Sequence, residues 1–191
     1  SESIDNLSRS VDLAYLRFDI NPKFSISVGK MCADWGAWEF DWNPIDIYEY
    51  SDIIEYADNF LTGLAFSYQT SRNHQYTIQV LDSRTKTFTE LYGNQPNFTA
   101  SKAPLAFVAN WRGSFLDRKI NTIWSYSLFN EAQDLAGNSA NMNYVALGTE
   151  LNLGKIGFIY DFKWSDEALD RTGIVSETVP DSLYAFALSN T

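Results

Sequence analysis

The sequence contains one cysteine, Cys32, and one histidine, His74, among its 191 residues. A lone cysteine excludes an intrachain disulfide framework. Because zinc and other transition metals are held mainly by clustered cysteine and histidine side chains, the same scarcity argues against such a metal site. We therefore expect no cofactor and no metal, and we interpret Cys32 as a half-buried thiol and His74 as a turn residue.

Long apolar runs and an excess of basic residues are also missing. No stretch reaches the roughly 18 apolar residues of a transmembrane helix, so a helical membrane protein is excluded. Fourteen Lys and Arg residues oppose 24 Asp and Glu, for a net charge of -10, which argues against a nucleic-acid partner. Residues 1–10 lack the apolar core of a secretory signal, so we expect the chain to start at a mature or trimmed end.

Aromatic residues, in contrast, make up 16% of the chain, and they favour strands. Alternation of apolar and polar residues with a period of two predicts strands over 11–20, 24–31, 60–70, 75–82, 105–113, 120–129, 141–151 and 156–164. Most of these segments are long for a soluble protein, and transmembrane strands need about nine to eleven residues.

The predicted connections alternate between short and long. Short ones lie at 21–23, 71–74, 114–119 and 152–155, and long ones at 32–59, 83–104, 130–140 and after 165. Outer-membrane barrels have short turns at one end and longer loops at the other. The alternation therefore favours a membrane barrel over a soluble sandwich.

The two faces of the predicted strands differ in polarity. One face is apolar and carries no charged residue, as lipid contact requires. The other is small and polar, and it supplies the residues that we expect to line the lumen of a barrel: Arg17, Asp19, Arg112, Glu150, Asp161 and Lys163. A soluble two-sheet domain that buries the apolar face remains the alternative.

Several segments resemble the phosphate-selective porin (O and P type) family. They are NPKFS (21–25), VGK (28–30), WEFD (38–41), NPIDIYEY (43–50), YS (126–127), FNEA (129–132), YDFK (160–163) and EALDR (167–171). No single motif is diagnostic, but their order and spacing are similar to those of the family from about residue 13 to residue 191.

The resemblance implies an all-β protein, an antiparallel up-and-down transmembrane β-barrel of the bacterial outer membrane. The resemblance also implies a larger barrel of sixteen strands that forms a homotrimer, with one loop folded inward to narrow the pore. We expect residues 1–191 to form one partial barrel domain of about eight strands, in contact with outer-membrane lipid and lipopolysaccharide. A closed eight-stranded barrel remains the alternative.

Residues 32–58, called the acidic segment below, contain eight acidic residues and no Lys or Arg. Aromatic residues are interleaved with the acids, and Asn43 followed by Pro44 predicts the start of a helix running to about Tyr56. Connections of this length in compact domains are usually functional. The candidates for a pore constriction are Asp34, Glu39, Asp41, Asp46, Glu49, Asp52 and Glu55.

Carboxylates in a constriction favour cations over anions, whereas phosphate selectivity requires converging Arg and Lys side chains. We therefore predict passive diffusion of small solutes or ions through a general or weakly cation-preferring pore. An alternative places the acids in an outer loop, where they are solvated or bind divalent cations that bridge lipopolysaccharide.

Two other functions compete with the porin hypothesis. Glu39 and Asp41 beside three tryptophans resemble a glycosidase cleft, but sequence proximity does not establish the required carboxylate spacing. We find neither a nucleophile elbow nor a phosphate-binding glycine loop, and we expect no enzyme. A secreted carbohydrate-binding β-sandwich with exposed aromatic platforms remains the second hypothesis.

Overall fold

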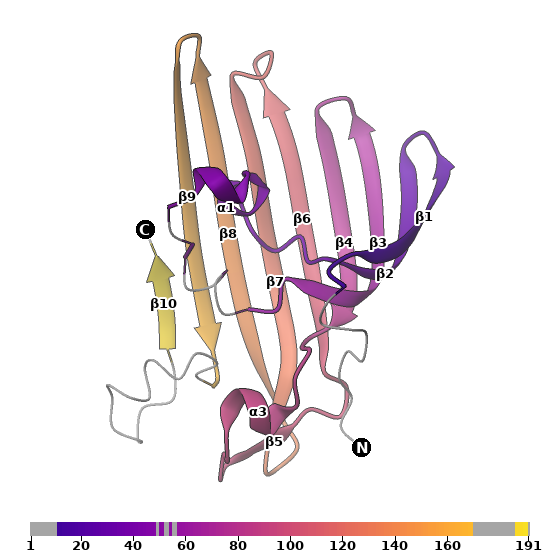
Figure 1. Ribbon diagram of the computed structural model, residues 1–191, viewed down its shortest axis with the longest axis vertical. Coiled ribbons are helices and arrows are strands. Elements are labelled where there is room, and N and C mark those ends of the chain that lie inside the picture. Colours follow the sequence, from indigo (N-terminus) through magenta and orange to yellow (C-terminus); the bar gives the residue numbers. More distant parts are fainter. Residues whose placement is uncertain (1–10, 49, 52–53, 55–56, 170–185, 191) are drawn as a thin grey trace.

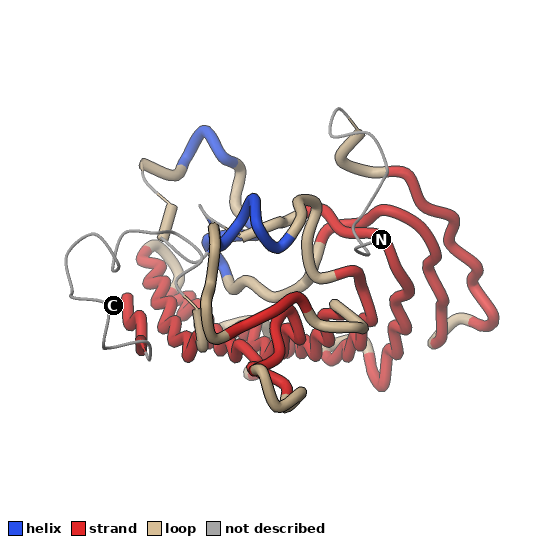
Figure 2. The backbone as a smooth tube through the Cα atoms, turned by 90° about the horizontal axis from the view of Figure 1, so that it is seen from below, coloured by secondary structure: helices blue, strands red, loops and turns tan. Residues whose placement is uncertain are grey.

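The computed structural model describes residues 11–48, 50–51, 54, 57–169 and 186–190. These residues form one curved antiparallel sheet, with loops and short helices on its concave side (Figure 1, Figure 2). Nine strands follow the order β1-β2-β3-β4-β6-β7-β8-β9-β10, and the short β5 pairs with β7. The predicted all-β, up-and-down antiparallel fold is confirmed, and the described strands form an open sheet.

The strands and helices have the following bounds. The strands are β1 (Ala14–Asn21), β2 (Phe24–Cys32), β3 (Phe60–Ser71), β4 (His74–Asp82), β5 (Phe98–Ala100), β6 (Leu105–Phe115), β7 (Ile120–Asp134), β8 (Ser139–Leu153), β9 (Ile156–Glu167) and β10 (Phe186–Asn190). The helices are α1 (Trp38–Asp41), the 3-10 helix η1 (Pro44–Asp46) and α3 (Phe88–Tyr92). In the described part of the chain, no helix is long and apolar enough to cross a membrane.

Eight strands match the predicted segments, and the tight turns β1–β2, β3–β4, β6–β7 and β8–β9 lie together at one end of the sheet (Figure 1). The long connection predicted over 130–140 is wrong. β7 continues to Asp134 and β8 begins at Ser139, with the side chain of Asp134 accepting hydrogen bonds from Asn138 across the turn. Polar residues here pair across the two strands, with a register shift between Asn130 and Ala132, because strand pairing satisfies the backbone whatever the side-chain polarity.

The helix predicted from Pro44 to Tyr56 is also wrong as a continuous element. Asn43 caps the first turn as expected, its side chain accepting from the Ile45 backbone, but the helix ends at Asp46. Tyr48, just beyond, is fully exposed, so no packing surface supports another turn. Residues 49, 52–53 and 55–56 of the predicted helix lie outside the described residues.

The apolar face of the strands is exposed. One continuous row crosses the sheet through eight paired residues: Phe18, Ile26, Phe66, Ile78, Ala109, Tyr126, Val145 and Trp164. Ile78 in this row is 57% exposed and Phe18 51%. Within the described residues no second sheet covers this outward face, which disfavours the sandwich.

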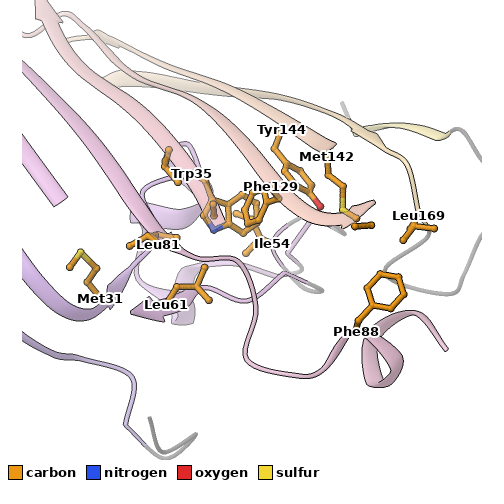
Figure 3. Packing of buried hydrophobic residues seen from close by; sticks show 14 of the residues in the cluster. Met31, Trp35, Ile54, Leu61, Leu81, Phe88, Phe129, Met142, Tyr144 and Leu169 are labelled. Atoms are coloured by element: carbon orange, nitrogen blue, oxygen red, sulfur yellow. The ribbon is translucent and has the colours of Figure 1, made fainter. Parts of the chain in front are cut away.

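The opposite, inner face has two parts. A polar row across it runs through Ser25, Ser67, Thr77, Asn110, Ser125, Ala146 and Lys163. Towards the end with the long loops, the same face instead carries a buried hydrophobic cluster that includes Leu61, Leu81, Phe129 and Met142 (Figure 3). Loop residues complete this cluster, so the inner face is not polar throughout, contrary to the prediction.

Candidate functional site

The acidic segment leaves β2 and crosses the inner face of the sheet. The backbone N–H of Asp34 donates to the side chain of Gln79 on β4 at 2.8 Å, and Asn110 on β6 donates to the Asp34 carbonyl at 2.9 Å. Ser125 on β7 donates to the Trp35 carbonyl at 2.6 Å. Polar side chains of three successive strands thus satisfy the backbone of a segment that lacks regular structure.

The crossing continues to β8 and β9. The backbone N–H groups of Trp38 and Glu39, at the start of α1, donate to the carboxylate of Asp161 at 3.3 and 2.8 Å. Gly148 on β8 lies beneath them, and a Cβ atom there would stand 2.8 Å from the Ala37 Cβ. The missing side chain at Gly148 therefore allows the close approach of the segment to β8.

A first charge cluster joins α1 to β9. The Lys163 ammonium forms an ion pair with Glu39 and lies 3.8 Å from the Asp161 carboxylate. The Lys163 side chain is only 4% exposed and that of Glu39 15%. This cation is therefore surrounded by two carboxylates, one from each element, and is largely removed from water.

A second charge cluster joins the segment to β6. Arg112 donates two hydrogen bonds to the Asp41 carboxylate, the one from Nη2 being 2.7 Å long, and lies 3.9 Å from Asp34. Burial raises the pKa of the Asp34 carboxyl above its ordinary value, an effect that Arg112 opposes and Asp41 reinforces. The bidentate geometry holds the guanidinium in one orientation.

Trp35 anchors the segment between these charges and the hydrophobic cluster. Trp35 is 1% exposed, and its ring lies 5.8 Å from the ring of Tyr144 on β8 (Figure 3). The ring of Phe40 lies 6.0 Å from that of Trp35. A buried aromatic side chain of this size contributes much of the packing energy of a site. Residues 33–41 are therefore held by packing, hydrogen bonds and charge together.

The structure brings together six of the residues named from the sequence: Asp34, Glu39, Asp41, Arg112, Asp161 and Lys163. Asp46 is exposed on η1, Glu150 accepts from Asn121, and Arg17 pairs with Asp19 on the exposed β1. Glu49, Asp52 and Glu55 lie outside the described residues.

Sequence reasoning missed four residues that position the segment: Gln79, Asn110, Ser125 and Gly148. Their signal was present in the alternation, since each occupies the polar face of its strand. The pattern did not reveal that their partner is the backbone of the acidic segment.

Two polar hollows open on the inner face near the tight turns. One, of about 550 Å³, is lined by residues that include Arg17, Lys23 and Ser67, and the other, of about 490 Å³, by residues that include Arg112 and Arg118. Gln69 and Gln75 line both hollows. Amide, hydroxyl and charged groups in such numbers suit a surface that contacts water and polar solutes.

Comparison with known proteins agrees with this arrangement. The sequence model of the family described as phosphate-selective porin O and P matches residues 1–179. Neither the curated proteins nor the solved structures contain a match. The exposed apolar outward face and the polar row of the inner face fit this match, which covers most of the chain and shows that it belongs to the phosphate-selective porin O and P family, channel-forming porins of the Gram-negative outer membrane.

Proposed function

We propose that this porin conducts small solutes by passive diffusion, and that its acidic segment lies in the lumen and favours cations over phosphate. The inner face lines water in this proposal, with residues 33–46 narrowing the passage. The described sheet is then part of the wall of one barrel domain. Assembly as a homotrimer and contact with lipopolysaccharide stay predictions.

The charge of the crossing supports a cation preference. Asp34, Glu39, Asp41 and Asp161 oppose Arg112 and Lys163, which leaves two more carboxylates than bases at this point of the inner face. Asp46 adds an exposed carboxylate nearby in the sequence. Rings of carboxylates raise the local concentration of cations in a pore.

A phosphate site would instead require bases that are free to bind the anion. Phosphate is bound by several charge-assisted hydrogen bonds from converging Arg and Lys side chains. At the crossing of the acidic segment, the bases Arg112 and Lys163 already bind Asp41 and Glu39. That pairing is the single observation that carries the proposal.

A catalytic pair of Glu39 and Asp41 is not supported by these contacts. Each carboxylate binds a base on a different strand, Lys163 on β9 and Arg112 on β6. The family match also points to a channel rather than an enzyme.

The test is the reversal potential of the purified protein in a planar bilayer across a KCl gradient. We expect a potential of the sign that a cation-selective pore gives. Asp41→Asn and Glu39→Gln should each move it towards anion selectivity, because each removes one negative charge and releases a base. Asp117→Asn, on the exposed β6–β7 turn, changes the charge equally and should have the smaller effect.

Anion selectivity of the unaltered protein, with block of the KCl current by phosphate, would overturn the proposal. If Asp41→Asn and Asp117→Asn changed the reversal potential equally, the acidic segment would not be the element that sets ion selectivity.

A further inference from the structure

Each of the four tight turns carries at least one exposed basic residue, in a chain whose net charge is -10. The residues are Lys23 in β1–β2, Arg72 in β3–β4, Arg118 and Lys119 in β6–β7, and Lys155 in β8–β9. Asp117 is the one acidic residue within these turns. The end of the sheet with the tight turns is therefore positive, although the protein as a whole is acidic.

Unlike Arg112 and Lys163, these five bases have no ionic partner among the residues that the structure describes. All five residues are exposed, and no ion pair within the described residues includes any of their side chains. Their charge is thus available to an anionic partner outside the chain.

An aromatic belt lies on the outward face directly beside the turns. Trp111 on β6 packs with its ring 5.2 Å from that of Trp124 on β7, and it stacks on His74 at 6.0 Å and Tyr76 at 6.3 Å. Tyr160 on β9 lies in the same cross-strand row as His74 and is 58% exposed, so it extends this belt. Aromatic belts of outer-membrane barrels lie at the level of the lipid headgroups, so the basic turns adjoin that level.

The belt also forms one wall of an apolar groove on the outward face. The groove has a volume of about 400 Å³ and is lined by residues that include Ile78, Trp111, Trp124 and Val145 around the small Ala109. Ala109 stands in the row between Ile78 and Tyr126, so the groove results from a small residue among large ones. Its apolar surface suits a hydrocarbon chain.

We propose that the end of the barrel with the tight turns is a binding surface for anionic phospholipid, with headgroup phosphates on the turn bases and an acyl chain in the groove at Ala109. Phosphate accepts charge-assisted hydrogen bonds from Lys and Arg, and bases near a membrane surface attract anionic lipid. The leaflet is the periplasmic one, which the short turns of such barrels face. This inference rests on membership of the family and not on the proposed ion preference.

The test measures the relative binding of lipids by tryptophan quenching. The protein is reconstituted in vesicles of brominated phosphatidylcholine mixed with unbrominated phosphatidylglycerol, which relieves quenching wherever it displaces the brominated lipid. We expect phosphatidylglycerol to bind more tightly than phosphatidylcholine at low salt, by roughly fivefold at a site where one base contacts the headgroup. Raising the salt to about 1 M should reduce the preference, because charges are then screened within about 3 Å.

Matched variants locate the effect. Arg72→Gln with Arg118→Gln, in the β3–β4 and β6–β7 turns, should reduce the preference several-fold. Lys86→Gln with Lys102→Gln removes the same charge from exposed positions in the long β4–β6 connection at the opposite end and should leave it unchanged. The proposal is overturned by equal binding of the two lipids or by equal effects of the two variants. The proposal would also be overturned if brominated lipid did not quench the fluorescence of Trp111 and Trp124. Another copy of the chain would then cover the groove.

Discussion

Lys163 shows how a buried charge holds the acidic segment to the sheet. Its ammonium lies between Glu39 and Asp161, with little exposure to water. Removal of one member of such a cluster is costly because the remaining charges stay buried without compensation. Replacement of both partners of a buried pair by uncharged groups costs much less.

Lys163→Met should therefore weaken docking of the segment by about 3–5 kcal/mol, since it leaves two buried carboxylates together. The measurement is amide hydrogen exchange of residues 34–41. The double variant Lys163→Met with Glu39→Gln should recover much of the protection. Unchanged exchange in Lys163→Met would show that the ion pair does not hold the segment.

Asp34 makes docking depend on pH. Because the pKa of this carboxyl is raised in the docked segment, its ionisation opposes docking. This cost is absent below about pH 4, the ordinary Asp pKa, grows as the pH rises through the raised value, and is constant above it.

Asp34→Asn should therefore protect the amides of residues 33–37 more than the unaltered protein does at pH 8, with the difference vanishing near pH 4. Asp46→Asn, at an exposed position, is the control and should show no such trend. Weaker protection of Asp34→Asn at pH 8 would mean that attraction to Arg112 exceeds the cost of burial.

Among the elements, the acidic segment depends on Trp35 as its apolar anchor. Trp35→Ala should cost about 3–5 kcal/mol of docking free energy, because it leaves a cavity beside Tyr144. Trp42, at 45% exposure, is the matched control, and Trp42→Ala should change docking little. Limited proteolysis within residues 36–48 reports the difference, and equal cleavage of the two variants would contradict it.

Elements that are formed by interactions between residues close together in the sequence were predicted correctly, and those that depend on distant residues were not. Strands such as β3 and β4 were predicted correctly because alternation is local and one face meets an apolar environment. The end of β7 and the start of β8 were not predicted, because the pairing of Asn130 with Asn141 depends on two strands together and not on local alternation. The helix after Asp46 failed because local capping does not suffice without a packed face.

At the scale of the whole molecule, the outward face should tolerate no charge. Phe66 and Ser67 are neighbours on β3 that point to opposite faces, with Phe66 in the exposed apolar row and Ser67 in the polar one. Phe66→Lys should destabilise the membrane-inserted state by about 2–4 kcal/mol.

Ser67→Lys places the same charge on the inner face and should insert normally. The two variants are compared by their yield of folding into lipid vesicles. The folded fraction is measured on a gel as the band whose mobility changes on heating. Equal yields would contradict the assignment of the faces.

The sequence by itself determined the long strands, their two faces, the tight turns and the family, because these depend on residues close together along the chain. Only the tertiary structure decided that the acidic segment crosses the inner face, that Arg112 binds Asp41 from 71 residues away, and that Lys163 binds Glu39. It also decided that loops complete a hydrophobic cluster on that face. The reason is physical: the path of a segment without regular structure is set by the partners of its backbone and charges, and here those partners lie on strands β4 to β9.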